Sequence, residues 1–124
     1  MWIRNFLTLC LSIALQLGWA WAECKILTPS VMYLGKNENY DLSITVEPDG
    51  LCPIFFNAQA GGVSFTSSEI LAKPSAGRLA PAGHNDFAYV APKAAGQDSF
   101  KLRLCGIDTA GTGCNVLTYA VQVN

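Results

Sequence analysis

Cysteine is the residue type with the most chemical potential in this 124-residue chain. Free thiolates bind metals or cycle between redox states, whereas paired cysteines cross-link the chain. Five are present: Cys10, Cys24, Cys52, Cys105 and Cys114. None of their spacings is C-x-x-C, and the single histidine is distant from all of them in sequence. The pattern therefore favours structural disulfides over a metal or redox site.

The first 22 residues have the pattern of a cleavable secretory signal peptide. Arg4 is the only charged residue among them, an apolar run extends over residues 6–17, and Ala20-Trp21-Ala22 matches a small-x-small cleavage site. We expect cleavage after Ala22, with residues 23–124 as the single mature domain. The alternative is an uncleaved membrane anchor.

Loss of that segment removes Cys10 and leaves four cysteines in an exported domain, a number that predicts two disulfides. Cys105 and Cys114 flank a glycine-rich stretch, residues 106–113, that is long enough for a hairpin loop. Facing cysteines on such a hairpin lie close enough to bond. We predict the pair Cys105–Cys114 and, by elimination, Cys24–Cys52.

Other chemistry-bearing side chains form no recognisable catalytic or metal-binding pattern. His84, the only histidine, lies in Gly-His-Asn-Asp, a composition typical of an exposed turn. Neither G-x-S-x-G nor H-E-x-x-H occurs, and the carboxylates show no D-x-D cluster of the calcium-binding kind. We predict no catalytic residue, no metal site and no cofactor, and we interpret Asp98 as a residue that caps a turn.

The charges of residues 23–124 are sparse and mixed in sign. These residues include seven basic side chains (eight in the chain less Arg4) and nine acidic ones, which gives a net charge of about −2. There is no basic stripe and no acidic tail. Nucleic acid and anionic membranes are therefore not expected as partners once the signal peptide is removed.

Alternating apolar and polar residues predict strands in the part of the chain that would position these groups. The clearest segment is 40–47, where four apolar side chains alternate with polar ones. Shorter segments at 26–34, 51–57, 63–71, 78–86 and 115–123 are separated by turn signals. We expect about seven to nine short antiparallel strands in an all-β sandwich or barrel.

Residues 86–105 predict two strands joined by a tight corner. The first strand ends at a proline, which has no amide hydrogen for a central ladder. A glycine then allows the turn, and an Asp-Ser pair can hydrogen-bond back onto the turn backbone. The residues of this corner motif are Phe87, Tyr89, Pro92, Gly96, Asp98 and Phe100.

This corner, F-x-Y-x-x-P followed by G-x-D-S-F, resembles the second half of bacterial immunoglobulin-like and cadherin-like repeat domains. The loop at residues 73–77 and the alternating last strand extend the resemblance over residues 73–123. The resemblance implies an immunoglobulin-like two-sheet sandwich with adhesive, spacer or binding roles outside the cytoplasm. This chain departs from the family in being a lone domain with four cysteines.

Phe55 and Phe56 are adjacent in a predicted strand, so their rings must face opposite sides. One of them must lie outside the main core, either as a contact for a partner or beneath a loop.

Taken together, these patterns predict a secreted or periplasmic binding or accessory module that is not an enzyme. Its partner would be a protein or another component of the cell envelope. The contacts would come from an edge strand or from loops gathered at one end, near residues 49–50, 60–62 and 108–113. The alternatives are a structural subunit of an envelope assembly that acts by strand pairing, or a small enzyme inhibitor that uses residues 106–113.

Overall fold

A computed structural model of the chain describes residues 24–29, 32–56 and 62–124. The expected signal peptide, residues 1–22, lies outside the described residues. Within them the all-β prediction is confirmed, and no helix is long and apolar enough to cross a membrane. The elements are β1 (Cys24–Leu27), the short 3₁₀ helix η1 (Leu34–Lys36), β2 (Asn39–Val46), β3 (Leu51–Phe55), β4 (Ser64–Ala72), β5 (Arg78–Gly83), β6 (Asp86–Val90), β7 (Gly96–Asp108) and β8 (Gly111–Val123).

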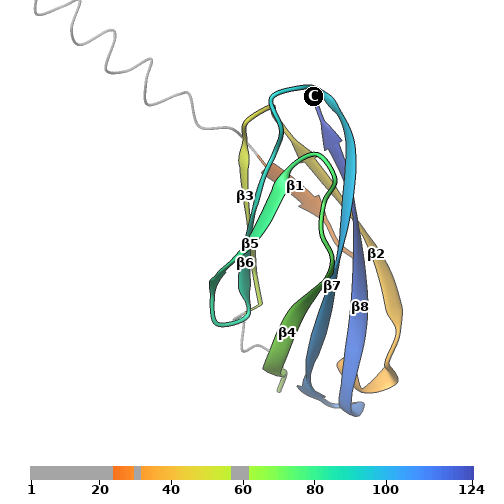
Figure 1. The fold of residues 1–124 in the computed structure, drawn as a ribbon. Coiled ribbons are helices and arrows are strands. Elements are labelled where there is room, and N and C mark those ends of the chain that lie inside the picture. The colour runs from red at the N-terminus through yellow and green to blue at the C-terminus, as the bar shows by residue number, and fades with distance from the viewer. Residues whose placement is uncertain (1–23, 30–31, 57–61) are drawn as a thin grey trace, which may run out of the picture.

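The strands form two sheets (Figure 1). The large sheet has the order β1-β2-β8-β7-β4, and the small sheet has the order β3-β6-β5. All neighbours are antiparallel except β2 and β8, which run parallel from the pair Asn39–Val116 to the pair Val46–Val123. The expectation of an entirely antiparallel sandwich is therefore wrong. Alternation tells which face of a strand is buried, but it does not tell the direction of the neighbouring strand.

One apolar core lies between the sheets and receives alternate side chains from both. Its centre is a stack of three aromatic rings. Tyr89 of the small sheet stacks on Phe100 of β7 with 5.3 Å between ring centroids, and Phe100 stacks on Tyr119 of β8 at 4.7 Å. The other fully buried large side chains are Ile44, Val46, Cys52, Leu102, Asn115, Leu117 and Val123. Stacked rings of this kind stabilise a core beyond the area they bury.

The glycine-rich stretch at 106–113 is not the turn that the sequence predicts. β7 continues to Asp108 and β8 begins at Gly111, so only two residues connect them. Gly113 instead allows η1 to pack closely on this hairpin, and Gly106 allows the close approach of β4, because a Cβ atom at these positions would collide with backbone atoms of Leu34 and Ser64, respectively. The strand expected at residues 26–34 is also different in the structure: β1 ends at Leu27, and the next described element is η1.

The carboxylate of Asp98 is the centre of the predicted corner and is almost wholly buried, with 8% of the residue exposed. It accepts a hydrogen bond from the Tyr89 hydroxyl at 2.6 Å. It also accepts hydrogen bonds from four backbone N–H groups at 2.8–3.3 Å, those of Ser75, Ala76, Gly77 and Ser99. These donors belong to the loop between β4 and β5, to β6 and to β7. One side chain thus links segments of both sheets, in the capping role that the sequence predicts.

The structure pairs Cys24 with Cys52 and Cys105 with Cys114, the same pairs that the sequence predicts. Cys105–Cys114 joins facing positions of the β7–β8 hairpin. Cys24–Cys52 joins β1, at an edge of the large sheet, to β3, at an edge of the small one. The second bond is therefore a covalent link between the two layers.

We expect Asp98→Ala to lower the free energy of unfolding by about 3 kcal/mol, because five donors lose a shared charged acceptor. Burial raises the pKa of this carboxyl, but Tyr89 and the backbone N–H groups lower it more, and the net pKa lies below its ordinary value. Stability from Asp98 is therefore complete above about pH 4 and is lost as the pH falls below that. Urea unfolding between pH 2 and 7 measures both effects. The matched control is Asp41→Ala on the exposed side of β2, and equal losses in the two variants would contradict this role.

The two disulfides should differ in their contribution to stability. Chain entropy gives about 3.5 kcal/mol for the Cys24–Cys52 bond, whose partners are 28 residues apart, and about 2.5 kcal/mol for Cys105–Cys114, whose partners are 9 apart. Replacing each pair by serines and comparing urea midpoints tests this order. A larger loss from the hairpin pair would show that chain entropy does not govern the difference.

Candidate functional site

The outer face of the small sheet consists mainly of apolar side chains, with one charged residue at each end. On β3, Cys52 and Ile54 point into the core, whereas Leu51 and Phe55 point outward and are 55% and 59% exposed. Cross-strand register places the outward residues in three rows: Leu51–Val90–Arg78, Pro53–Ala88–Ala80 and Phe55–Asp86. We call the six apolar members the apolar face: Leu51, Pro53, Phe55, Ala80, Ala88 and Val90.

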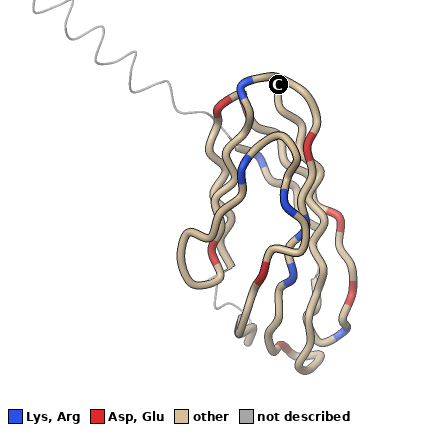
Figure 2. The backbone as a smooth tube through the Cα atoms, viewed as in Figure 1, with Lys and Arg blue, Asp and Glu red and all other residues tan. Residues whose placement is uncertain are grey.

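The outer face of the large sheet is mixed in character. It carries polar and charged side chains, including Asp41 and Thr45 on β2 and Lys101 on β7, and the separate exposed apolar side chains of Leu27 on β1 and Ile107 on β7. Arg103 of β7 forms an ion pair with Glu69 of β4 across this face, with 3.3 Å between nitrogen and oxygen. Figure 2 shows that charged residues are sparse along the strands of the small sheet. The contiguous apolar face of the small sheet is therefore the candidate contact surface.

The two adjacent phenylalanines divide as the alternation requires. Phe56 is half-buried and meets Phe65 and Phe87 edge-on, with ring centroids 6.1 and 6.4 Å apart. Its backbone N–H donates to the carbonyl of Asn85 at 3.2 Å. Phe55 is the ring left outside the core. Of the predicted pair, only Phe55 belongs to the apolar face, and its contact with a partner stays a prediction.

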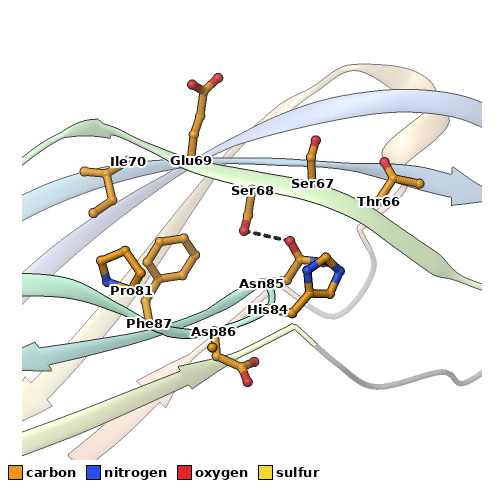
Figure 3. A pocket seen from close by; sticks show the side chains of 11 residues that line it. Thr66, Ser67, Ser68, Glu69, Ile70, Pro81, His84, Asn85, Asp86 and Phe87 are labelled. Carbon is orange, nitrogen blue, oxygen red and sulfur yellow. Dashed lines mark hydrogen bonds between the residues drawn. The ribbon is translucent and has the colours of Figure 1, made fainter.

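Two opposite charges border the apolar face at opposite ends. Arg78 shares a row with Leu51, and Asp86 shares a row with Phe55. One carboxylate oxygen of Asp86, Oδ1, is buried and has no hydrogen-bond partner among the described residues. Among those residues the Arg103–Glu69 contact is the sole ion pair, so Arg78 and Asp86 are not paired there. Figure 3 shows the Asp86 carboxylate pointing away from Phe87, on the outer side of β6.

A groove of about 440 Å³ lies between β4 and the β5–β6 hairpin (Figure 3). The Ser68 hydroxyl donates to Asn85 Oδ1 at 2.9 Å, and Asn85 Nδ2 lies 3.1 Å from His84 Nε2. Ser68 therefore contacts an amide and not the imidazole. An amide cannot take the proton that activates a nucleophile, so this chain of contacts does not form a catalytic pair. It fixes the hairpin turn, where Asn85 is buried at φ 57° and His84 is exposed, as predicted.

Each edge strand carries a feature that disfavours pairing with another chain. β3 contains Pro53 and β5 contains Pro81, and proline has no N–H to donate. β4 has register shifts at Phe65/Ser67 and at Ile70/Ala72, and β1 is only four residues long. Prolines, bulges and short length are the means by which proteins protect sheet edges. The edges are therefore poor sites for strand addition, in contrast to the apolar face.

The loops expected to cluster at one end do not do so (Figure 1). The turn at Asp49 lies beside the C-terminus, because Asp49 N–H donates to Pro92 and Asn124 N–H donates to Val46. The β7–β8 turn lies at the other end of the molecule, beside η1. Part of the third expected loop, residues 60 and 61, lies outside the described residues. The two loops that are described therefore do not form a shared binding site.

The corner motif residues also serve the fold. Phe87, Tyr89 and Phe100 are buried in the core, and Asp98 holds the loop at residues 75–77. Gly96 has a φ of 154° at the start of β7. Among the described residues no three His, Cys, Asp or Glu side chains are grouped to hold a metal ion.

Sequence reasoning found Phe55 but missed the rest of the apolar face. Ala80, Ala88 and Val90 are unremarkable singly, and only their registration beside β3 makes them one surface. The outward alternation of Leu51, Pro53 and Phe55 was the one available signal.

Comparison with known proteins gives no relative for this chain: no family model, no curated protein and no solved structure matches it.

We expect Phe55→Ala to change the free energy of unfolding by less than about 1 kcal/mol, because most of the ring is already exposed to water. Phe87→Ala, in the core, should cost about 3–5 kcal/mol. Urea unfolding of both variants measures the difference. A loss above about 2 kcal/mol for Phe55→Ala would mean that this ring serves the fold.

Proposed function

We propose that this protein is an exported binding or accessory module without catalytic activity, and that its contact surface is the apolar face. The observation that carries the proposal is the exposure of Phe55 and Leu51, 59% and 55%, on the outer side of a sheet whose inner side already fills the core. Exposed rings and branched side chains lower their free energy when a partner removes them from water. The partner is a protein or another envelope component.

The proposed fold is the immunoglobulin-like sandwich, and the strand order supports it. In that fold one sheet contains strands in the order B-E-D and the other contains G-F-C. β3-β6-β5 matches the first order, and β8-β7-β4 matches the second. β2 takes the place of a first strand that pairs with the last strand, which accounts for the parallel pairing of β2 and β8.

Export is proposed from two features that agree. The first 22 residues have the charge, the apolar run and the cleavage site of a signal peptide. Both cysteine pairs of the described chain are joined as disulfides, which form in oxidising compartments.

The two alternative functions receive less support. A structural subunit that assembles by strand pairing needs an open edge, whereas proline, bulges or short length affect every edge strand. An inhibitor needs a protruding rigid loop, whereas the stretch at 106–113 is mostly strand with a two-residue turn. Neither alternative explains the apolar face.

A photo-crosslinking residue, benzoylphenylalanine, at position 55 tests the proposal in exporting cells. We expect it to form adducts upon irradiation, because the apolar face is where the partner binds. The matched control is the same residue at position 120, an exposed site on the outer face of the large sheet. Equal labelling from both positions, or labelling only from position 120, would remove the apolar face from the proposal.

A further inference from the structure

We infer that the occupant of the apolar face is a second copy of this chain, packed face to face to form a weak homodimer. The inference rests on the proposed function, because it names the partner of the same surface. Two observations on that surface carry it: the placement of its two charges and the distribution of its large side chains.

The two border charges make the face complementary to itself. A face-to-face dimer has its two-fold axis in the interface plane. If that axis runs across the strands, each end row lies over the opposite end row of the second copy. The Asp86 end of each copy then faces the Arg78 end of the other copy, which gives two equivalent contacts, one on each side of the axis. A foreign partner would need its own matched charges, whereas a second copy carries both at the required positions.

The same operation matches the large apolar side chains. Phe55 lies at the Asp86 end of β3 and Leu51 lies at the other end, so each ring faces Leu51 of the second copy. The row on the axis is Pro53–Ala88–Ala80, which contains no bulky or charged side chain. Small residues on the axis allow the two sheets to approach at the usual spacing of about 10 Å.

The second copy also offers Asp86 a partner of opposite charge. Asp86 makes no ion pair among the described residues. The Arg78 guanidinium of the second copy carries several N–H donors on a long side chain that reaches one strand across. A charge-assisted pair of this kind is stronger than a neutral hydrogen bond.

The size of the face sets the strength of the dimer. Three strands about 4.8 Å apart and five residues of about 3.4 Å each give a footprint of roughly 250 Å². A standard stable interface buries about 800 Å² on each partner, so this dimer belongs to the weak class. Association should therefore be visible only toward the high end of a concentration series.

Sedimentation velocity from about 10 μM to 1 mM tests the inference on the disulfide-bonded chain from residue 23. We expect wild type to shift from monomer to dimer over this range. Arg78→Asp and Asp86→Arg should each weaken association by about tenfold or more, because each places like charges opposite one another. Combining both reversals restores two opposite-charge pairs and should restore the dimer.

Asp41→Arg, on the outer face of the large sheet, is the matched control and should leave association unchanged. Circular dichroism melting verifies that every variant is folded.

The outcomes separate this inference from the proposed function. A dimer that persists in both single reversals, or that the combination fails to restore, overturns the two-fold packing. A chain that stays monomeric to 1 mM overturns the homodimer, and adducts from position 55 with a different protein would then leave the proposed function standing. Monomeric behaviour without specific adducts from position 55 would overturn both. Loss with single reversals and recovery with the combination, together with self-adducts at position 55, supports both.

Discussion

The buried carboxylate of Asp98 is the interaction on which the arrangement of the two sheets depends. It holds the loop at residues 75–77, where the chain passes from β4 of the large sheet to β5 of the small one. It also fixes the Tyr89 hydroxyl, and Tyr89 begins the aromatic stack that continues through Phe100 to Tyr119. A charge buried among donors from three segments tolerates few displacements, because a small shift would leave several donors unpaired. Asp98 thus fixes the point at which the chain enters β5, next to Tyr89 of β6.

The inner and outer sides of the small sheet therefore have different tasks. The inner residues Cys52, Ile54 and Phe87 build the core, and their outward neighbours on the same strands form the apolar face. β3 has apolar side chains on both of its sides, and packing of the core accounts only for those on the inner side.

Much of the architecture could be predicted from local patterns, and the failures have physical causes. The alternation at Tyr40–Val46 and the Phe87–Phe100 corner report burial directly, so these strands and the capping role of Asp98 were visible. The parallel pairing of β2 with β8 was not, because burial patterns carry no direction. Gly106 and Gly113 were misread as turn residues because glycine serves equally for close packing. The apolar face was only partly visible, because Arg78 and Asp86 are brought to its ends by register and not by sequence proximity.

The position of the Cys24–Cys52 bond gives the sandwich a fixed side and a free side. That bond closes the side where β1 and β3 meet. On the opposite side, where β4 and the β5–β6 hairpin border the groove, the Ser68–Asn85 hydrogen bond spans the sheets. The loop at residues 73–77 and its contacts with Asp98 join the sheets at one end of that side, so fluctuations that separate the layers should begin at the other end, where one hydrogen bond holds the β5–β6 turn to β4. The domain is in this sense hinged, with its axis of opening set by the Cys24–Cys52 bond.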